Sequence, residues 1–257
     1  MSKKRKFFIF ACLLIALLGI GYIVYYYVEI NNNNKVYEKI QDTTKKKVTK
    51  EVAKEEPPEK ALELPIDFAE LQKMNTDIYA WVEIPGTNIN YPIVQSDVDD
   101  TYYLMRTVEK QEGYPGSIYT EKVNAKDFTD FNTIIYGHEM KDGSMFGELK
   151  NYRDSAYMNA HPEIIIYTPD SIRRYKVFAA VTFDDRHIMQ SFDFQSKGGI
   201  EEYLNTIFSI RDLNSLITED ASVNVNSDSS IITLSTCIAS LPDNRLLVEA
   251  VLVNEQQ

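Results

Sequence analysis

Cysteine is almost absent from this sequence, which contains only two cysteines in 257 residues. Cys12 lies inside an apolar run near the N-terminus, so Cys237 has no partner within reach and a disulfide-stabilised fold is excluded. A lone cysteine is either a small buried hydrophobic side chain or a thiol that performs chemistry. Composition alone leaves both interpretations of Cys237 open.

Histidine is also scarce, and basic residues are outnumbered. His138, His161 and His187 are far apart in the sequence, and no closely spaced set of Cys and His ligands exists, so we expect neither a metal site nor a cofactor. Taken singly, each histidine is typical of a surface loop. The 27 basic residues face 38 acidic ones, which argues against nucleic acid as a partner, because phosphate binding needs a basic face.

The longest feature present is an uncharged apolar run over residues 7–28, preceded by four consecutive cations at 3–6. As a helix these residues would span roughly 33 Å, enough to cross a bilayer. A cleaved signal peptide would have a shorter apolar region and a small-residue cleavage site, and an apolar core helix would not normally adjoin a polar tail. We therefore predict an uncleaved signal-anchor with a cytoplasmic N-terminus and an extracellular remainder.

Four segments follow from this interpretation. Residues 1–6 form a cytoplasmic basic segment, 7–28 the transmembrane anchor and 29–63 an extracellular linker. The linker region is polar, contains runs of Asn and Lys and a Pro-Pro pair, and is expected to add nothing to a core, although it has some helical character. Residues 64–257 form the fourth segment, which the resemblance described below implies is a catalytic domain.

The domain has the pattern of a mainly β protein. Turn residues, such as those at 85–86 and 242–244, separate short apolar runs. Asp67 is a candidate helix cap, an amphipathic helix is expected around 200–208, and a further helix about 145–158. Such a set favours a closed eight-stranded β-barrel with peripheral helices. The expected strands are 80–84, 89–94, 116–119, 132–136, 163–167, 174–183, 231–236 and 246–253.

Three residues combine into a candidate catalytic set. Cys237 ends an apolar strand, and Arg245 begins the next strand eight residues later, so an antiparallel pair would place them side by side. A thiol needs a base or a positive neighbour to become a thiolate. His138 follows another apolar strand and is therefore expected at a strand end. A solvated arginine paired with Asp243 is the alternative for Arg245.

The motifs around these residues resemble those of sortases, and of class B sortases in particular. The segment 233–237, TLSTC, matches the TLxTC signature, Tyr136-Gly137-His138 the histidine motif, and Arg245 the arginine of the following strand. Residues 81–95, WVEIPGTNINYPIVQ, and GHEMK at 137–141 extend the likeness to about residues 66–253. The resemblance implies a sortase-type barrel and catalytic roles for Cys237, His138 and Arg245.

The same resemblance implies a reaction and a set of partners. A Cys237 thioester would form with the C-terminal sorting signal of a secreted protein, with His138 as acid and base. An amine of a peptidoglycan cross-bridge, or of its lipid-linked precursor, would then accept the acyl group. Arg245 would bind the substrate backbone or the oxyanion, with both roles open. Thr236, Ser235 and Leu104 match substrate-binding positions of the family.

Three other functions stay open at this stage. An extracellular cysteine peptidase would use the same chemistry with water as acceptor. A pilin-polymerising sortase would differ only in the amine that it accepts. A non-catalytic binding module on a stalk would leave Cys237 unreactive. Membrane tethering favours joining substrates at the cell surface, so we expect a wall-anchoring transpeptidase.

Overall fold

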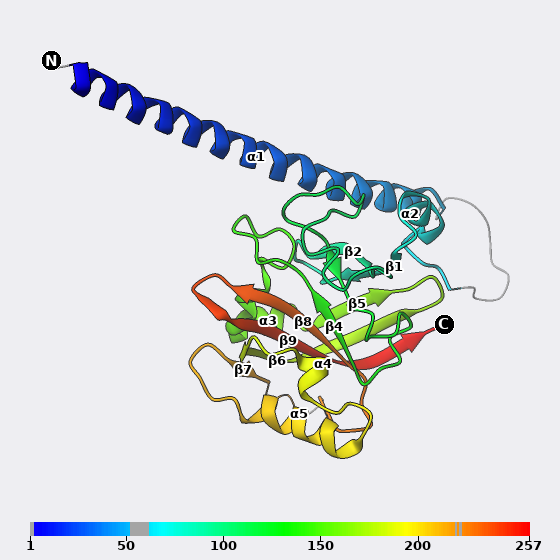
Figure 1. Ribbon diagram of the computed structural model, residues 1–257. Coiled ribbons are helices and arrows are strands. Elements are labelled where there is room, and N and C mark those ends of the chain that lie inside the picture. The colour runs from blue at the N-terminus through cyan, green and yellow to red at the C-terminus, as the bar shows by residue number, and fades with distance from the viewer. Residues whose placement is uncertain (1–2, 52–61, 219, 221–222) are drawn as a thin grey trace.

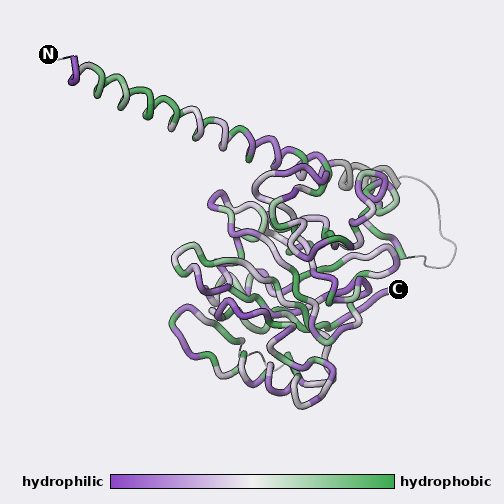
Figure 2. The backbone as a smooth tube through the Cα atoms, in the orientation of Figure 1, coloured by the Kyte–Doolittle hydropathy of each residue, from purple (hydrophilic) through white to green (hydrophobic). Residues whose placement is uncertain are grey.

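The computed structural model describes residues 3–51, 62–218, 220 and 223–257. Its first element is the 49-residue helix α1 (Lys3–Glu51), which projects far beyond the domain at its N-terminal end (Figure 1). Figure 2 shows that the projecting half is the apolar half. Within the described chain, this is the single helix long and apolar enough to cross a membrane.

The described strands form one sheet that closes into a barrel. Its hydrogen-bonded order is β5-β1-β2-β3-β4-β8-β9-β6, and pairing of β5 with β6 closes the ring of eight, while β7 extends it outside. The predicted closed eight-stranded barrel is thus confirmed. The strands are β1 (Ile78–Glu83), β2 (Asn90–Val94), β3 (Ile118–Tyr119), β4 (Asn132–Tyr136), β5 (Glu163–Tyr167), β6 (Ile172–Asp184), β7 (Leu216–Ile217), β8 (Ile231–Ile238) and β9 (Leu241–Gln256).

Helices cover the barrel on opposite sides (Figure 1). α2 (Phe68–Met74) packs beside α1, and Asp67 caps it by accepting a hydrogen bond from the Glu70 amide at 2.9 Å, as predicted. α5 (Lys197–Ser209) lies on the far side and buries the predicted apolar face against the barrel wall. A short helix, α4 (Ile188–Ser191), precedes it.

Two apolar cores result from strand alternation. On β8 and β9, Leu234, Leu246 and Val248 point into the barrel, where the larger core lies. The alternate residues Ile231, Leu247 and Val251 point outward and pack with α5 in a second core. Each strand therefore has one face inside the barrel and one outside.

The linker prediction is wrong in one respect. α1 continues without a break into residues 29–51, and Tyr37 and Ile40 are buried in the barrel-side core, with exposed fractions of 3% and 5%. The Tyr37 hydroxyl donates to the Gly116 carbonyl at 2.7 Å. The apolar residues here are sparse but fall on one helical face, so they do add to the core. Residues 52–61 lie outside the described part, and the four segment boundaries remain a proposal.

Two local predictions are also wrong. Instead of one helix over 145–158, the chain forms a 3-10 helix, η1 (Leu149–Arg153), and then α3 (Ser155–Ala160). Asp154 separates them, because its carboxylate accepts the Ala156 amide at 2.7 Å and starts a new helix. The turn expected at 242–244 lies at 239–240, so β9 begins earlier than predicted.

Candidate functional site

Cys237 lies one residue before the end of β8 and is exposed, between the buried side chains of Thr236 and Ile238. Alternation along the strand places it on the outward face with Thr233 and Ser235. The turn at 239–240 follows at once and leaves the thiol accessible at the end of the barrel. A rigid strand thus carries an accessible thiol.

Strand register places the three predicted catalytic residues in one row. Cys237 pairs with Arg245 across the antiparallel β8–β9 ladder. On the other side, Tyr136 of β4 pairs with Ser235 in a parallel ladder, and the Gly137 amide donates to the Ser235 carbonyl at 3.2 Å. Continuing that register by two residues brings His138 level with Cys237. Cys237 thus has Arg245 beside it on one neighbouring strand and the loop of His138 just beyond the end of the other, and we call these three residues the row.

His138 is held from two sides. Its Nε2 lies 2.8 Å from the Leu104 carbonyl oxygen, and its own carbonyl accepts the Phe146 amide at 3.0 Å. Burial lowers the pKa of His138 below its ordinary value, and the Leu104 carbonyl opposes this shift. The imidazole is therefore mainly neutral at neutral pH, which suits a group that must take a proton from a thiol.

Arg245 is half-buried and bound to its own hairpin. Its Nη1 donates to the carbonyls of Pro242 and Asn244, each at 3.0 Å. In the described structure no side-chain hydrogen bond directly joins His138, Cys237 and Arg245. These carbonyls, and not the Asp243 carboxylate of the alternative interpretation, hold the guanidinium, which keeps further donors for a ligand beside Cys237.

The predicted substrate-binding residues divide into two groups. Ser235 shares the outward face of Cys237, and Leu104 borders His138 through its carbonyl. Thr236 points the other way, is only 2% exposed, and has a hydroxyl oxygen with no hydrogen-bond partner. The structure leaves Leu104 exposed beside His138, whereas Ser235 and Thr236 are both buried, with exposed fractions of 4% and 2%.

Two further residues adjoin the row and were not predicted. Tyr114 packs its ring against His138 with centroids 4.9 Å apart. Glu139 accepts the Ala239 amide at 3.0 Å and so ties the histidine loop to the turn after Cys237. Glu139 stands in the GHEMK motif and was detectable there. Tyr114 lies in a long connection between strands, and no local pattern marks it.

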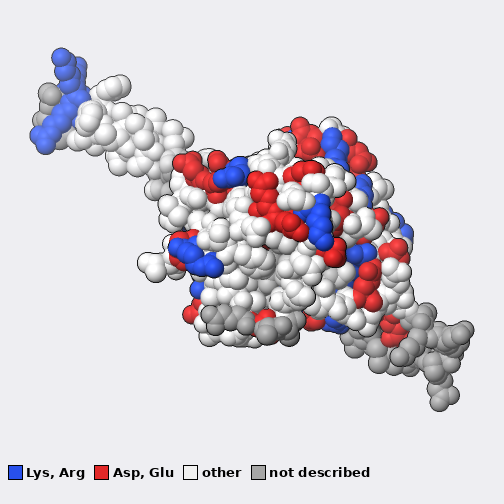
Figure 3. All heavy atoms as spheres, turned by 90° about the horizontal axis from the view of Figure 1, so that it is seen from below, with Lys and Arg blue, Asp and Glu red and all other residues white. Residues whose placement is uncertain are grey.

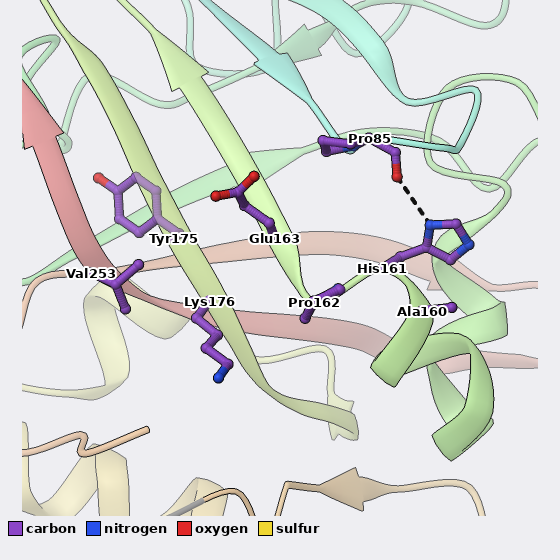
Figure 4. A pocket seen from close by; sticks show the side chains of 8 residues that line it. All are labelled: Pro85, Ala160, His161, Pro162, Glu163, Tyr175, Lys176 and Val253. Carbon is purple, nitrogen blue, oxygen red and sulfur yellow. Dashed lines mark hydrogen bonds between the residues drawn. The ribbon is translucent and has the colours of Figure 1, made fainter. Parts of the chain in front are cut away.

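The other histidines are engaged elsewhere. His187 Nε2 lies 2.7 Å from Glu121, and His161 Nδ1 lies 3.0 Å from the Pro85 carbonyl. His161 lines a separate cavity of about 390 Å³ beside β5 and β6 (Figure 4). Two charged residues line this cavity: Glu163, which pairs with Arg174, and Lys176, which pairs with Asp220. In the described part of the chain no cluster of His, Cys, Asp or Glu is arranged to hold a metal ion.

The arrangement suits nucleophilic acyl transfer. A neutral imidazole beside a thiol can accept its proton as the sulfur attacks a carbonyl, and can return that proton to the departing amine. A guanidinium on the other side of the sulfur offers donors to a carbonyl or oxyanion.

Comparison with known proteins identifies the family. The protein-family model of the sortase domain matches residues 82–253 of this chain. Sortase B of Listeria monocytogenes is 37% identical over 172 residues, which cover 66% of this chain and 67% of that protein. Sortase B of Staphylococcus aureus is 30% identical over 241 residues, 92% of this chain and 91% of that protein.

Solved structures agree. Sortase B from Bacillus anthracis in complex with AAEK1 has a TM-score of 0.72 and 32% identity, covering 89% of this chain and 99% of that one. The Staphylococcus aureus sortase B–substrate complex has a TM-score of 0.73 and 25% identity, covering 88% and 99%. The chain therefore belongs to the sortase family of cysteine transpeptidases, and within it to the class B sortases.

Proposed function

We propose that this chain is a membrane-anchored transpeptidase that joins secreted proteins to the cell wall. It would cleave the C-terminal sorting signal of its substrate and transfer the acyl group to an amine of the peptidoglycan cross-bridge or its lipid-linked precursor. The single observation that carries the proposal is the pairing of an exposed Cys237 with Arg245 across β8 and β9, with the loop of His138 following β4 on the other side of β8. Family membership supports the same reaction, and the Staphylococcus aureus relative was solved as a substrate complex.

In the first step the Cys237 thiol adds to the scissile carbonyl as His138 takes its proton. The tetrahedral intermediate collapses when the C–N bond breaks, and His138 returns the proton to the departing amine. A thioester between Cys237 and the sorting signal remains. In the second step the acceptor amine attacks that thioester, His138 relays a proton from the amine to the sulfur, and a new amide is released.

Arg245 and the surrounding residues have supporting roles in this proposal. The guanidinium would give up one or both of its hydrogen bonds to the loop carbonyls and donate instead to the substrate carbonyl or the oxyanion. Leu104, exposed beside His138, would contact the substrate, and Ser235 would act from a buried position two residues before Cys237. Thr236 contributes through its backbone and the strand geometry, because its side chain faces the barrel interior.

The residues before the domain complete the proposal. Residues 7–28 would cross the membrane, with the cations of 3–6 in the cytoplasm and the catalytic domain outside. This part rests on the length and composition of α1 and on the charge that precedes the apolar run.

The test uses a fluorogenic peptide with a candidate sorting sequence, incubated with the full-length protein and an amine acceptor. A transpeptidase gives a ligated product, whereas a peptidase gives only hydrolysis. Cys237→Ala should abolish both products without altering the melting temperature, because only a sulfur atom at the surface is removed. Residual turnover above a few per cent in that variant would exclude the thioester route. Hydrolysis alone in the wild-type protein would favour the peptidase.

A further inference from the structure

One aromatic side chain outside the predicted site lies against the imidazole. The ring of Tyr114 is tilted by 50° to the ring of His138, with centroids 4.9 Å apart. Tyr114 also lies within electrostatic range of Cys237: burial, then Tyr26, then Cys237 raise the pKa of the Tyr114 hydroxyl, and Asp142 and Glu139 add to the effect. Tyr114 therefore lies against the base of the proposed reaction and within electrostatic range of its nucleophile.

Tyr114 also contacts α1. Tyr26 stacks on it with centroids 6.3 Å apart and ring planes 26° apart. The same helix binds the backbone around it, since Asn33 Nδ2 donates to the Tyr114 carbonyl at 2.9 Å and the Tyr37 hydroxyl donates to the Gly116 carbonyl at 2.7 Å. Three residues on one face of α1 thus hold a single short segment of the domain.

The close fit at Gly113 supports a specific contact. A Cβ added at this glycine would lie 2.7 Å from Glu29 Oε1 and 3.1 Å from Asn33 Nδ2, so α1 approaches the backbone more closely than most side chains allow. Tyr26 is 37% exposed, while its neighbours Tyr25 and Tyr27 are 64% and 67% exposed. The domain therefore covers one particular tyrosine of the three at the end of the apolar run.

We propose that Tyr114 is a positioning residue for His138, and that the anchor helix holds it in place through Tyr26, Asn33 and Tyr37. The inference rests on the catalytic role of His138 proposed above. The ring of Tyr114 shields one side of the imidazole from water and limits its rotation toward Cys237. The helix that anchors the enzyme thereby holds Tyr114, and through it His138, in position.

Removal of the Tyr114 ring would admit water to the imidazole. Because burial is what lowers the pKa of His138, its value should rise toward that of an exposed histidine. Looser placement of the imidazole should also lower kcat about 10-fold, since misplaced groups lose much of the advantage of proximity. A residue that acts only by positioning His138 makes no contact with the substrate, so KM should change little.

The experiment uses the full-length protein in detergent micelles or lipid nanodiscs. Histidine side chains are labelled with ¹³C and titrated by NMR, and His138→Gln assigns the signal of His138. Tyr114→Ala should raise the titration midpoint of His138 and lower kcat, while Tyr114→Phe, which keeps the ring, should resemble the wild type. Thermal unfolding of each variant shows whether it is folded.

The link to the helix has its own matched pair. Tyr26→Ala should shift the His138 titration in the same direction as Tyr114→Ala, by a smaller amount, and lower kcat. Tyr25→Ala removes an exposed tyrosine one position earlier in the helix and should leave both quantities unchanged. If Tyr26→Ala and Tyr25→Ala behave alike, the anchor helix does not support the site. An unchanged His138 titration in Tyr114→Ala would overturn the positioning role itself.

The titration separates this proposal from the proposed function. It measures the surroundings of His138 whether or not the protein transfers acyl groups. A failure of Cys237→Ala to abolish turnover would refute the thioester mechanism while the NMR shifts still reported on the contact. If Cys237→Ala abolishes turnover but the His138 titration is unchanged in Tyr114→Ala and Tyr26→Ala, only the role of Tyr114 and α1 is refuted.

Discussion

At the residue scale, Arg245 is the least explained member of the row. Its guanidinium already satisfies two carbonyls of the loop that carries it, and its backbone is fixed opposite Cys237 by the β8–β9 ladder. Two roles are compatible with this position. The guanidinium either donates to the substrate in a planar fork, or acts as a positive charge that favours the thiolate.

Substitution of Arg245 separates these roles. If the fork is needed, Arg245→Lys should lower kcat/KM by roughly 10²-fold or more, the scale for losing one oxyanion donor, and Arg245→Ala should be at least as damaging. If charge is what matters, lysine should restore most of the activity, and alanine should slow the alkylation of Cys237. Rates of peptide cleavage and of alkylation against pH give both answers. Near-normal turnover of Arg245→Ala would exclude both roles.

Glu249 is the other residue with unusual chemistry. It is fully buried on the outward face of β9, where it accepts the Tyr203 hydroxyl at 2.7 Å. The single hydroxyl proton of Thr233 faces two acceptors, Asn132 Oδ1 at 2.9 Å and Glu249 Oε2 at 2.8 Å. A proton on Glu249 would supply the missing donor. Burial accordingly raises the pKa of Glu249 to about 7.

A raised pKa makes stability depend on pH with a defined sign. Unfolded Glu249 loses its proton near pH 4.5 and the folded residue near pH 7, so its stabilising contribution is complete below pH 4.5 and is lost as pH rises to about 7. The melting temperature of the wild type should therefore fall, relative to that of Glu249→Gln, across this interval and then run parallel to it. Glu201→Gln, which changes an exposed residue of α5, is the control. Curves that stay parallel from pH 4.5 to 7 would show that Glu249 is already ionised.

At the element scale, the sequence predicted local patterns well and long-range packing poorly. The TLSTC strand and the apolar run after Arg245 have strong strand composition, so their pairing, and with it the row containing Cys237, was predictable. The helix expected over 145–158 failed because Asp154 caps a new helix in the middle of it.

The contacts of α1 are the clearest example of what the sequence does not reveal. Tyr37 and Ile40 occur in a polar stretch whose composition indicates a linker, and their burial depends on a domain surface formed by distant residues such as Gly116. The place of Tyr114 beside the site was not predictable from the sequence, for the same reason. Its contacts are with residues that are far away in the chain, Tyr26 and His138.

Burial of Tyr37 and Ile40 has a consequence for truncation. A chain that starts at Leu64 loses both side chains, and burial of each contributes about 1.5–3 kcal/mol, so it should be less stable than a chain that starts at Glu29 by roughly 3 kcal/mol or more. Chemical denaturation of the two chains measures the difference. Within the longer chain, Tyr37→Ala should reproduce part of the loss, and Lys35→Ala, at an exposed position of the same helix, should not. Equal stability of the two chains would mean that α1 only rests on the domain.

At the scale of the whole molecule, charge and apolar surface are segregated. Figure 3 shows basic side chains at the tip of α1, an uncharged stretch behind them, and mixed acidic and basic side chains on the domain. The net charge of the chain is −11, and without the four cations at 3–6 it is about −15. The cations that precede the apolar run support the proposed orientation, in which the N-terminus lies in the cytoplasm.

Protease treatment of intact protoplasts tests this orientation. Digestion should remove the domain and leave a membrane-embedded stub that contains residues 7–28, because the bilayer protects only the apolar part of α1. An antibody against a tag at residue 1 should detect the stub only after the cells are permeabilised. A full-length catalytic domain found free in the medium would show instead that the apolar segment is cleaved.

The unbroken length of α1 determines how such an enzyme meets its substrates. At about 1.5 Å per residue a 49-residue helix is roughly 73 Å long, and the part beyond residue 28 is fastened to the domain rather than free to swing. With residues 7–28 in a bilayer, the thiol would stay at a nearly constant height above the lipid. No flexible linker between the membrane span and the domain would extend the range of heights that the thiol can reach. Encounter would then be a two-dimensional search, in which lateral diffusion of enzyme and substrate limits the rate. Substrates that expose their cleavage site at another height would pass by without reacting.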